Sequence, residues 1–146
     1  MKDYNIYLSG GMASFGKENF SKSNDWRVYI KYVLEHTDTS KYRVNAYNPN
    51  DYYSFYDDDI WKISDKEIME YDIYRLRKSD LLIVNFNDKN SLGTMSEIAI
   101  AYDRNIPIIG LDENKQVLHS WQLEMCNKIF NYKDELLDYV EKYYLT

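Results

Sequence analysis

The chain has 146 residues and a formal net charge of −6, a length that suits one domain with its own hydrophobic core. The acidic balance argues against a broad basic face for a nucleic acid polymer. The chain has no apolar run of 18 residues and no signal-peptide run at its start, which argues against a membrane span or export. A single cysteine, Cys126, and two distant histidines predict neither a disulfide framework nor a metal site. We therefore expect one cytoplasmic domain over residues 1–146, with no metal, no cofactor and no membrane partner.

Apolar runs and helical periodicity alternate along the chain. Short apolar runs ended by turn residues predict strands at residues 4–8, 42–47, 81–86 and 106–109. Apolar residues at helical spacing predict helices around residues 26–34, before residue 81, around 95–102 and around 136–143. This alternation indicates an α/β fold: a single-domain, doubly wound, flavodoxin- or Rossmann-like sheet, mostly parallel, of about five strands with helices on both faces.

Ligands of such sheets bind beyond the carboxyl ends of the strands. Three segments leave strands at that edge, at residues 9–12, 48–62 and 87–93. The segment 48–62 is irregular, acidic and aromatic, and a long loop in a compact α/β domain is more often functional than idle.

Asp72 is the first candidate for chemistry. In the helix before residue 81 it falls on the same inward stripe as Met69, Ile73 and Leu76. A carboxylate among apolar neighbours is costly unless it is paired or functional. Asp72 is therefore either a functional group with a raised pKa or a partly buried aspartate satisfied by backbone amides or by Arg75.

Glu97 is the second candidate, and its sequence context allows two interpretations. Thr94-x-x-Glu97 matches a capping box, so that Glu97 would cap its own helix. Alternatively, a carboxylate in the first turn of a helix lies at the positive end of the helix dipole and stays ionised. Held at the ligand edge of a sheet, such a carboxylate is a competent nucleophile for an anomeric carbon.

Tyr7 and the loop after it complete the candidates from residue patterns. Tyr7 lies near the end of the first predicted strand, where its phenol either donates to a neighbouring carboxylate or is an ordinary core group. Ser9, Gly10, Gly11 and Met12 follow directly. They form a weak anion-binding signal, because the full glycine spacing of a dinucleotide fingerprint and the Walker lysine are both missing, or a plain tight turn.

Four segments together resemble the nucleoside 2-deoxyribosyltransferase superfamily, which includes the 2′-deoxynucleoside 5′-monophosphate N-glycosidases. They are Asn5-Ile6-Tyr7-Leu8-Ser9-Gly10-Gly11; Tyr71-Asp72 followed by residues 79–85; Ser91-Leu92-Gly93-Thr94-x-x-Glu97 followed by residues 98–101; and Leu118-His119-Ser120-Trp121. The most specific part of the resemblance is the ordered set Tyr7, Asp72, Gly93 and Glu97.

The resemblance implies a role for each of these residues. Glu97 would attack C1′ of the sugar and form a covalent glycosyl-enzyme, Tyr7 would orient it, and Asp72 would manage the proton of the departing base. Flat aromatic side chains would line the base, and the candidates are Tyr52, Tyr53, Phe55 and Trp61.

Ser91 stands where the transferases usually carry an aspartate, whereas the monophosphate N-glycosidases carry a serine that helps to hold the 5′-phosphate. A hydroxyl tolerates a phosphate dianion that a carboxylate would repel. The arginine that the phosphate-binding branch leads one to expect is missing from the Ser9 loop. Arg27 and Arg104 are the available substitutes, with the amides of the Ser9 loop and of the Gly93 turn as further donors.

The resemblance also implies a homodimer or higher homo-oligomer with a shared site. Residues 118–130 offer Trp121, Met125 and Phe130 at helical spacing, which either face a neighbouring subunit or pack on the chain's own sheet. The family brings an asparagine from the neighbour just before this segment, where this chain has Gln116-Val117.

Three functions remain open at this point. The first is cleavage or exchange of the N-glycosidic bond of a (2′-deoxy)nucleoside or its 5′-monophosphate. The second is a nucleotide-binding or sequestering module without turnover, and the third is an N-glycosidase that acts on an NAD-like dinucleotide.

Overall fold

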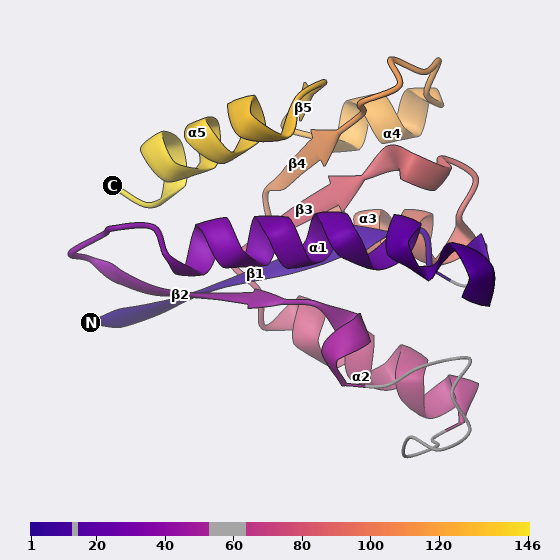
Figure 1. Cartoon of the computed structure of the whole chain (residues 1–146), viewed down its shortest axis with the longest axis horizontal. Coiled ribbons are helices and arrows are strands. Elements are labelled where there is room, and N and C mark those ends of the chain that lie inside the picture. The colour runs from indigo at the N-terminus through magenta and orange to yellow at the C-terminus, as the bar shows by residue number, and fades with distance from the viewer. Residues whose placement is uncertain (13–14, 53–63) are drawn as a thin grey trace.

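The computed structural model describes residues 1–12, 15–52 and 64–146. In these residues it has a five-stranded, all-parallel sheet in the order β2-β1-β3-β4-β5, as Figure 1 shows. The strands are β1 (Lys2–Gly10), β2 (Tyr42–Tyr47), β3 (Leu81–Asn85), β4 (Ile108–Leu111) and β5 (Lys128–Phe130). From β1 the chain first adds β2 on one side and then adds β3, β4 and β5 on the other side, so the strand order changes direction between β1 and β3. The doubly wound α/β fold expected from the sequence is therefore confirmed.

Within the described part of the chain, five α-helices cover the two faces of the sheet: α1 (Phe20–Glu35), α2 (Asp65–Arg77), α3 (Leu92–Asp103), α4 (Ser120–Met125) and α5 (Lys133–Tyr144). Helices α1 and α5 pack on one face through residues such as Ile30 and Val140. Helices α2 and α3 pack on the other face through residues such as Leu76 and Ile98. Three short 3-10 turns, Lys17–Asn19, Pro49–Asp51 and Phe86–Asp88, lie near strand or helix ends.

The central strands are apolar on both faces, as buried parallel strands must be. All five residues of β3 are buried, and its side chains alternate between the two cores. Strand β2 has the predicted bounds, because the Asn48-Pro49 turn ends it; Asn48 accepts a hydrogen bond from the backbone of Asn50.

The expectation of one helical stripe over residues 118–130 is wrong. Helix α4 ends at Met125, and Phe130 lies on strand β5 instead. Short apolar runs do not distinguish strand from helix by periodicity alone, and here Phe130 packs with Tyr139 of α5 at 5.2 Å between ring centroids.

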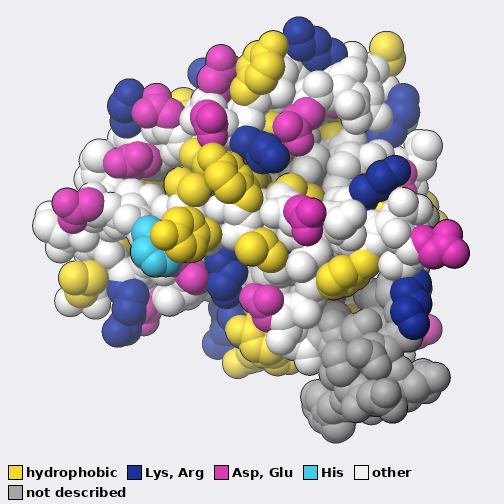
Figure 2. Space-filling view, in the orientation of Figure 1, with side chains coloured by type: hydrophobic (Ala, Val, Ile, Leu, Met, Phe, Trp, Pro, Cys, Tyr) yellow, Lys and Arg dark blue, Asp and Glu magenta, His cyan; other side chains and the backbone are white. Residues whose placement is uncertain are grey.

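The surface seen in Figure 2 carries Lys, Arg, Asp and Glu side chains interspersed, with single apolar side chains between them. Among the described residues, no helix is both long and apolar enough to cross a bilayer. The carboxyl ends of β1 and β3, at the reversal of the strand order, are where a fold of this kind places its ligand.

Candidate active site

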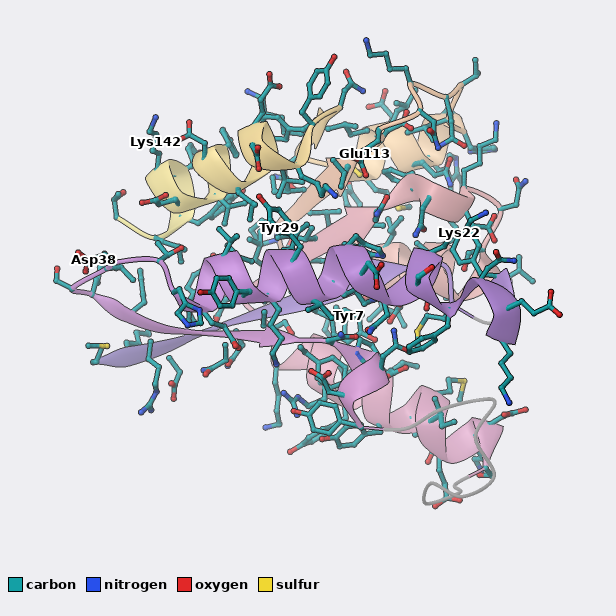
Figure 3. The ribbon with its side chains drawn as sticks, viewed as in Figure 1. Tyr7, Lys22, Tyr29, Asp38, Glu113 and Lys142 are labelled. Carbon is teal, nitrogen blue, oxygen red and sulfur yellow. The ribbon has the colours of Figure 1, made fainter. Side chains whose placement is uncertain are left out.

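A cavity of about 600 Å³ opens at the carboxyl ends of β1 and β3, within the range of small-ligand sites. Its walls come from β1, α1, α2 and α3 and from the segment that precedes α3. Three of the predicted residues, Tyr7, Asp72 and Glu97, line it together. In Figure 3, Tyr7 is labelled near the middle of the molecule, between α1 and α2 in this view.

Glu97 does not cap its helix. The N-cap of α3 is Ser91, whose hydroxyl oxygen accepts hydrogen bonds from the Thr94 amide at 3.3 Å and from the Thr94 hydroxyl at 2.9 Å. Glu97 therefore lies in the second turn, and both first-turn interpretations, the capping box and the dipole-held carboxylate, are wrong. Its place in the second turn turns its side chain toward β1, where Ser9 donates to Glu97 Oε1 at 2.8 Å.

The surroundings of Glu97 raise its pKa to about 7. Burial is the largest cause, and the negative charge of Asp72 adds to it. Hydrogen bonds from the hydroxyls of Tyr7 and Ser9 and the positive charge of Arg27 act in the opposite direction. A carboxyl with this pKa exists in both protonation states at neutral pH.

Asp72 faces the cavity and is not buried in the core. Its neighbour Met69 is 52% exposed and also lines the cavity, so the predicted inward stripe is a cavity wall in its first half and core only at Leu76. Tyr47 donates its hydroxyl to Asp72 Oδ1 at 2.9 Å. The sequence also allowed Arg75 to be the partner of Asp72, and this is wrong. Arg75 donates instead to the Tyr71 hydroxyl at 3.0 Å.

Arg27 is a site residue whose place the sequence leaves open. It is 1% exposed and lines the cavity from α1. Its guanidinium donates to the backbone carbonyl oxygens of Leu8 at 3.2 Å and Gly10 at 2.9 Å, and to that of Ser23. Arg27 thus holds the end of β1, and its positive charge acts on Glu97. Arg104, at the carboxyl end of α3, does not line the cavity.

The predicted loop at residues 9–12 belongs in part to the strand, because β1 continues to Gly10 and does not end at Leu8. Gly10 and Met12 line the cavity, whereas the Gly11 amide donates to Asn87 Oδ1 at 3.1 Å. Gly10 is required by packing, because a Cβ there would lie 2.8 Å from Trp26 Cζ2. Ser9 reaches the site through its hydrogen bond to Glu97.

Ser91 and Gly93 line the cavity at the start of α3. A Cβ on Gly93 would meet no atom within 4 Å, so this turn leaves open space beside its amide. A second hollow of about 540 Å³, lined in part by Ser91, Leu92 and Trp121, lies next to the first.

Other predicted residues lie elsewhere. Tyr53, Phe55 and Trp61 lie outside the described residues. Gln116 uses its side-chain amide within its own chain, donating to the backbone oxygen of Phe86 at 2.7 Å and to Asp112 at 2.9 Å. Among residues 1–12, 15–52 and 64–146, no cluster of three His, Cys, Asp or Glu side chains has the arrangement of a metal site.

Comparisons with known proteins identify the fold. No protein-family model and no curated protein matches the chain by sequence. A conserved protein of Enterococcus faecalis V583 matches with a TM-score of 0.74 at 17% identity, covering 95% of this chain and 98% of that one. The 2-deoxyribosyltransferase of Bacillus psychrosaccharolyticus matches with a TM-score of 0.69 at 13% identity, covering 92% and 91%.

The CMP N-glycosidase of Clostridium botulinum matches with a TM-score of 0.59 at 19% identity, covering 95% of this chain and 98% of that one. These likenesses extend over nearly the whole of each chain, so they concern the architecture and not one shared motif. The chain therefore has the fold of 2-deoxyribosyltransferases and of an N-glycosidase, the fold that its motifs predict.

Proposed function

We propose that the chain cleaves or exchanges the N-glycosidic bond of a (2′-deoxy)nucleoside or its 5′-monophosphate. The observation that carries this proposal is the meeting of Glu97, Tyr7 and Asp72 on one cavity at the reversal point of the sheet. The fold shared with two enzymes of N-glycosidic chemistry supports the same reading.

In the proposed reaction, Glu97 attacks C1′ in its ionised form. The C1′–N bond breaks, its electron pair goes to the base nitrogen, and Asp72 supplies the proton that the leaving base takes up. Water or a second base then attacks C1′ of the glycosyl ester, the C1′–O bond to Glu97 breaks, and its electron pair restores the Glu97 carboxylate. The ionised Asp72 takes the proton that the attacking water or base loses, so both carboxyl groups return to their starting states. Tyr7 and Ser9 hold Glu97 by hydrogen bonds that favour its ionised form.

A pure binding module is the less favoured alternative. A binder of an anionic nucleotide gains nothing from two carboxyl groups near one point, because each repels the ligand's phosphate. Here the charge of Asp72 raises the pKa of Glu97, so the two groups are close enough to interact. A carboxyl whose pKa is raised by burial and by a charged neighbour in a cavity is typical of catalytic sites.

The test is a panel of nucleosides and 5′-monophosphates, incubated with and without a second free base and analysed for released base. Base released without an acceptor identifies a hydrolase, and a new nucleoside formed only with an acceptor identifies a transferase. Release of nicotinamide from a dinucleotide in the same panel would favour the NAD-like alternative. If the chain binds a nucleotide measurably but cleaves no substrate, the alternative function of a binding module without turnover would be favoured.

The pH profile of kcat/KM is expected to fall below pH 7. Glu97 attacks only when ionised, and burial with the charge of Asp72 raises its pKa to about 7. Below that pH, kcat/KM should fall about tenfold per pH unit, because kcat/KM reports the ionisation of the free enzyme. A deoxynucleoside that does not titrate between pH 5 and 8 is the suitable substrate. A flat profile over that range would contradict the assignment of Glu97.

The chain is also expected to form a homodimer or a larger homo-oligomer. Three large apolar side chains beside the second hollow, Leu92, Val117 and Trp121, are 84%, 87% and 64% exposed, and such a patch commonly marks a protein interface. The alternative in which these side chains pack on the chain's own sheet holds for Met125 and Phe130, which pack against its two cores, but not for the exposed Trp121. Light scattering should give at least twice 17.6 kDa. A fully active monomer would exclude a shared site.

A further inference from the structure

Tyr47 connects strand β2 with Asp72, the candidate proton donor. It lies at the end of β2 and is 3% exposed. Its hydroxyl donates to Asp72 Oδ1 at 2.9 Å. This hydrogen bond fixes the orientation of the Asp72 carboxyl relative to β2.

Arg75 lies on the ring of Tyr47. Its guanidinium carbon is 4.4 Å from the ring centroid, and the same group donates to the Tyr71 hydroxyl at 3.0 Å. A cation over an aromatic face draws electron density from the ring, which makes a phenol a stronger hydrogen-bond donor. Arg75 therefore acts on Asp72 through Tyr47.

The ring of Tyr47 also contacts Tyr7, at 5.1 Å between centroids with an angle of 33°. Tyr7 in turn favours the ionised form of Glu97. Tyr47 thus touches both halves of the site: the Asp72 carboxyl through its hydroxyl, and the Tyr7 side through its ring. Because the buried Tyr47 contacts both Asp72 and Tyr7, it can fix the position of one relative to the other.

We propose that Tyr47, with Arg75 on its ring, is the positioning residue for Asp72. This inference rests on the proposed function, in which Asp72 gives a proton to the leaving base. Tyr47 does not contact the reacting atoms in this scheme. It holds the Asp72 carboxyl in place through Oδ1, and its effect appears only where the departing base needs a proton.

The test variant is Tyr47→Phe, which keeps the ring and removes the hydroxyl. Its matched control is Tyr42→Phe, on the same strand, where Lys41 lies over the ring at 5.3 Å and a second tyrosine ring, that of Tyr4, lies at 5.1 Å. With a natural deoxynucleoside, kcat of Tyr47→Phe should fall about 10- to 100-fold with KM nearly unchanged, the scale of a buried carboxyl that loses its hydrogen-bond donor. Tyr42→Phe should behave as the parent chain.

Two further measurements separate positioning from general damage. With 4-nitrophenyl 2-deoxyriboside, whose leaving group needs little protonation, Tyr47→Phe should lose less than about threefold, as Asp72→Ala should. In the Asp72→Ala background, Tyr47→Phe should cause no further loss on the natural substrate, since residues that act as a unit are non-additive. Equal losses on both substrates, or additive losses in the double variant, would overturn the inference.

The same four variants are compared by thermal unfolding, which does not depend on turnover. Tyr47→Phe should lower Tm by about 2–5 °C in the parent chain and by less in the Asp72→Ala background, where the phenol has lost this acceptor. If the parent chain releases base from no substrate, the proposed function fails, and the unfolding cycle still decides whether Tyr47 holds Asp72. If the parent chain is active and the kinetic and unfolding effects of the two residues are independent, the inference fails alone.

Discussion

Replacing Glu97 by glutamine should abolish turnover and at the same time stabilise the protein above pH 7. Glutamine keeps the shape of the side chain, and its Oε1 still accepts the hydrogen bond that Ser9 now gives to Glu97 at 2.8 Å. It carries no negative charge and cannot form the glycosyl ester. Loss of the nucleophile should raise the barrier by several kcal/mol, which is about a thousandfold or more in kcat.

The stability effect follows from the raised pKa of Glu97, about 7 against an ordinary 4.5. The folded state binds the proton more tightly than the unfolded state. The associated stability is therefore fully present below pH 4.5 and is lost as the pH rises through about 7. Glutamine stays neutral throughout, so at pH 8 the variant avoids a cost on the order of 2–3 kcal/mol.

The measurements are kcat on a cleaved substrate and Tm at pH 5 and pH 8. At pH 8 the Tm of Glu97→Gln should exceed that of the parent chain by roughly 5 °C, and near pH 5 the difference should nearly vanish. Glu141→Gln, an exposed glutamate on α5, is the matched control and should change neither quantity. Near-normal turnover in Glu97→Gln would refute the role of Glu97 as nucleophile. An unchanged Tm at both pH values would refute the raised pKa of Glu97 in the folded chain.

The strands and the sheet class were predictable because their signals are local. Strand β2 has the predicted bounds, since an apolar alternation and the Asn48-Pro49 turn both fix its end. Strand β5 has only three residues and follows α4 closely, so no periodicity distinguishes it from a continued helix. Local patterns define elements of ordinary length and fail for very short ones.

The predicted capping box at the start of α3, Thr94-x-x-Glu97, was wrong because the helix begins three residues earlier than this motif implies. Ser91 and Thr94 are both good N-cap residues, but only Thr94 is followed three residues later by a glutamate, as in a capping box. Only the structure shows that the helix begins at Leu92 with Ser91 as its cap. The shift of one turn moves Glu97 from a local capping role to the wall of the cavity.

The sequence named Arg27 only as a substitute phosphate ligand without a place, and it missed Tyr47, because the partners of both residues are distant in sequence. A signal for Arg27 exists: with Ser23, Ile30 and Leu34 it falls on the buried face of α1, and a buried arginine must have partners. For Tyr47 there is no comparable signal, since its acceptor Asp72 lies 25 residues away on another element. Contacts of this kind depend on the packing of α2 against the sheet.

Replacing Ser91 by aspartate should select against phosphorylated substrates. Ser91 is the N-cap of α3 and lines the cavity. Aspartate is as good an N-cap as serine, so the helix and the Thr94 hydrogen bonds should persist. The new carboxylate would stand at the mouth of a cavity already lined by Asp72, Asp88 and Glu97.

If the start of α3 and the loop after β1 hold a 5′-phosphate, this carboxylate repels it and removes the serine donor. The loss for a monophosphate should be about 2–4 kcal/mol from repulsion and lost hydrogen bonds, which is roughly 30- to 1,000-fold in kcat/KM. Arg27, beneath the Gly10 carbonyl at 2.9 Å, is the buried positive charge that favours a dianion at this place. The matching free deoxynucleoside carries no phosphate and should be affected much less.

The measurement is kcat/KM for a deoxynucleoside and its 5′-monophosphate at pH 8, where Glu97 is mostly ionised. Ser91→Asn is the control, because asparagine is an equally good N-cap of nearly the same shape without the charge. Discrimination by Ser91→Asp but not by Ser91→Asn would assign the effect to charge at the phosphate position. A parent chain that prefers the free nucleoside would show that the substrate carries no 5′-phosphate. Equal losses of kcat/KM on both substrates in Ser91→Asp would show that Ser91 does not hold the phosphate.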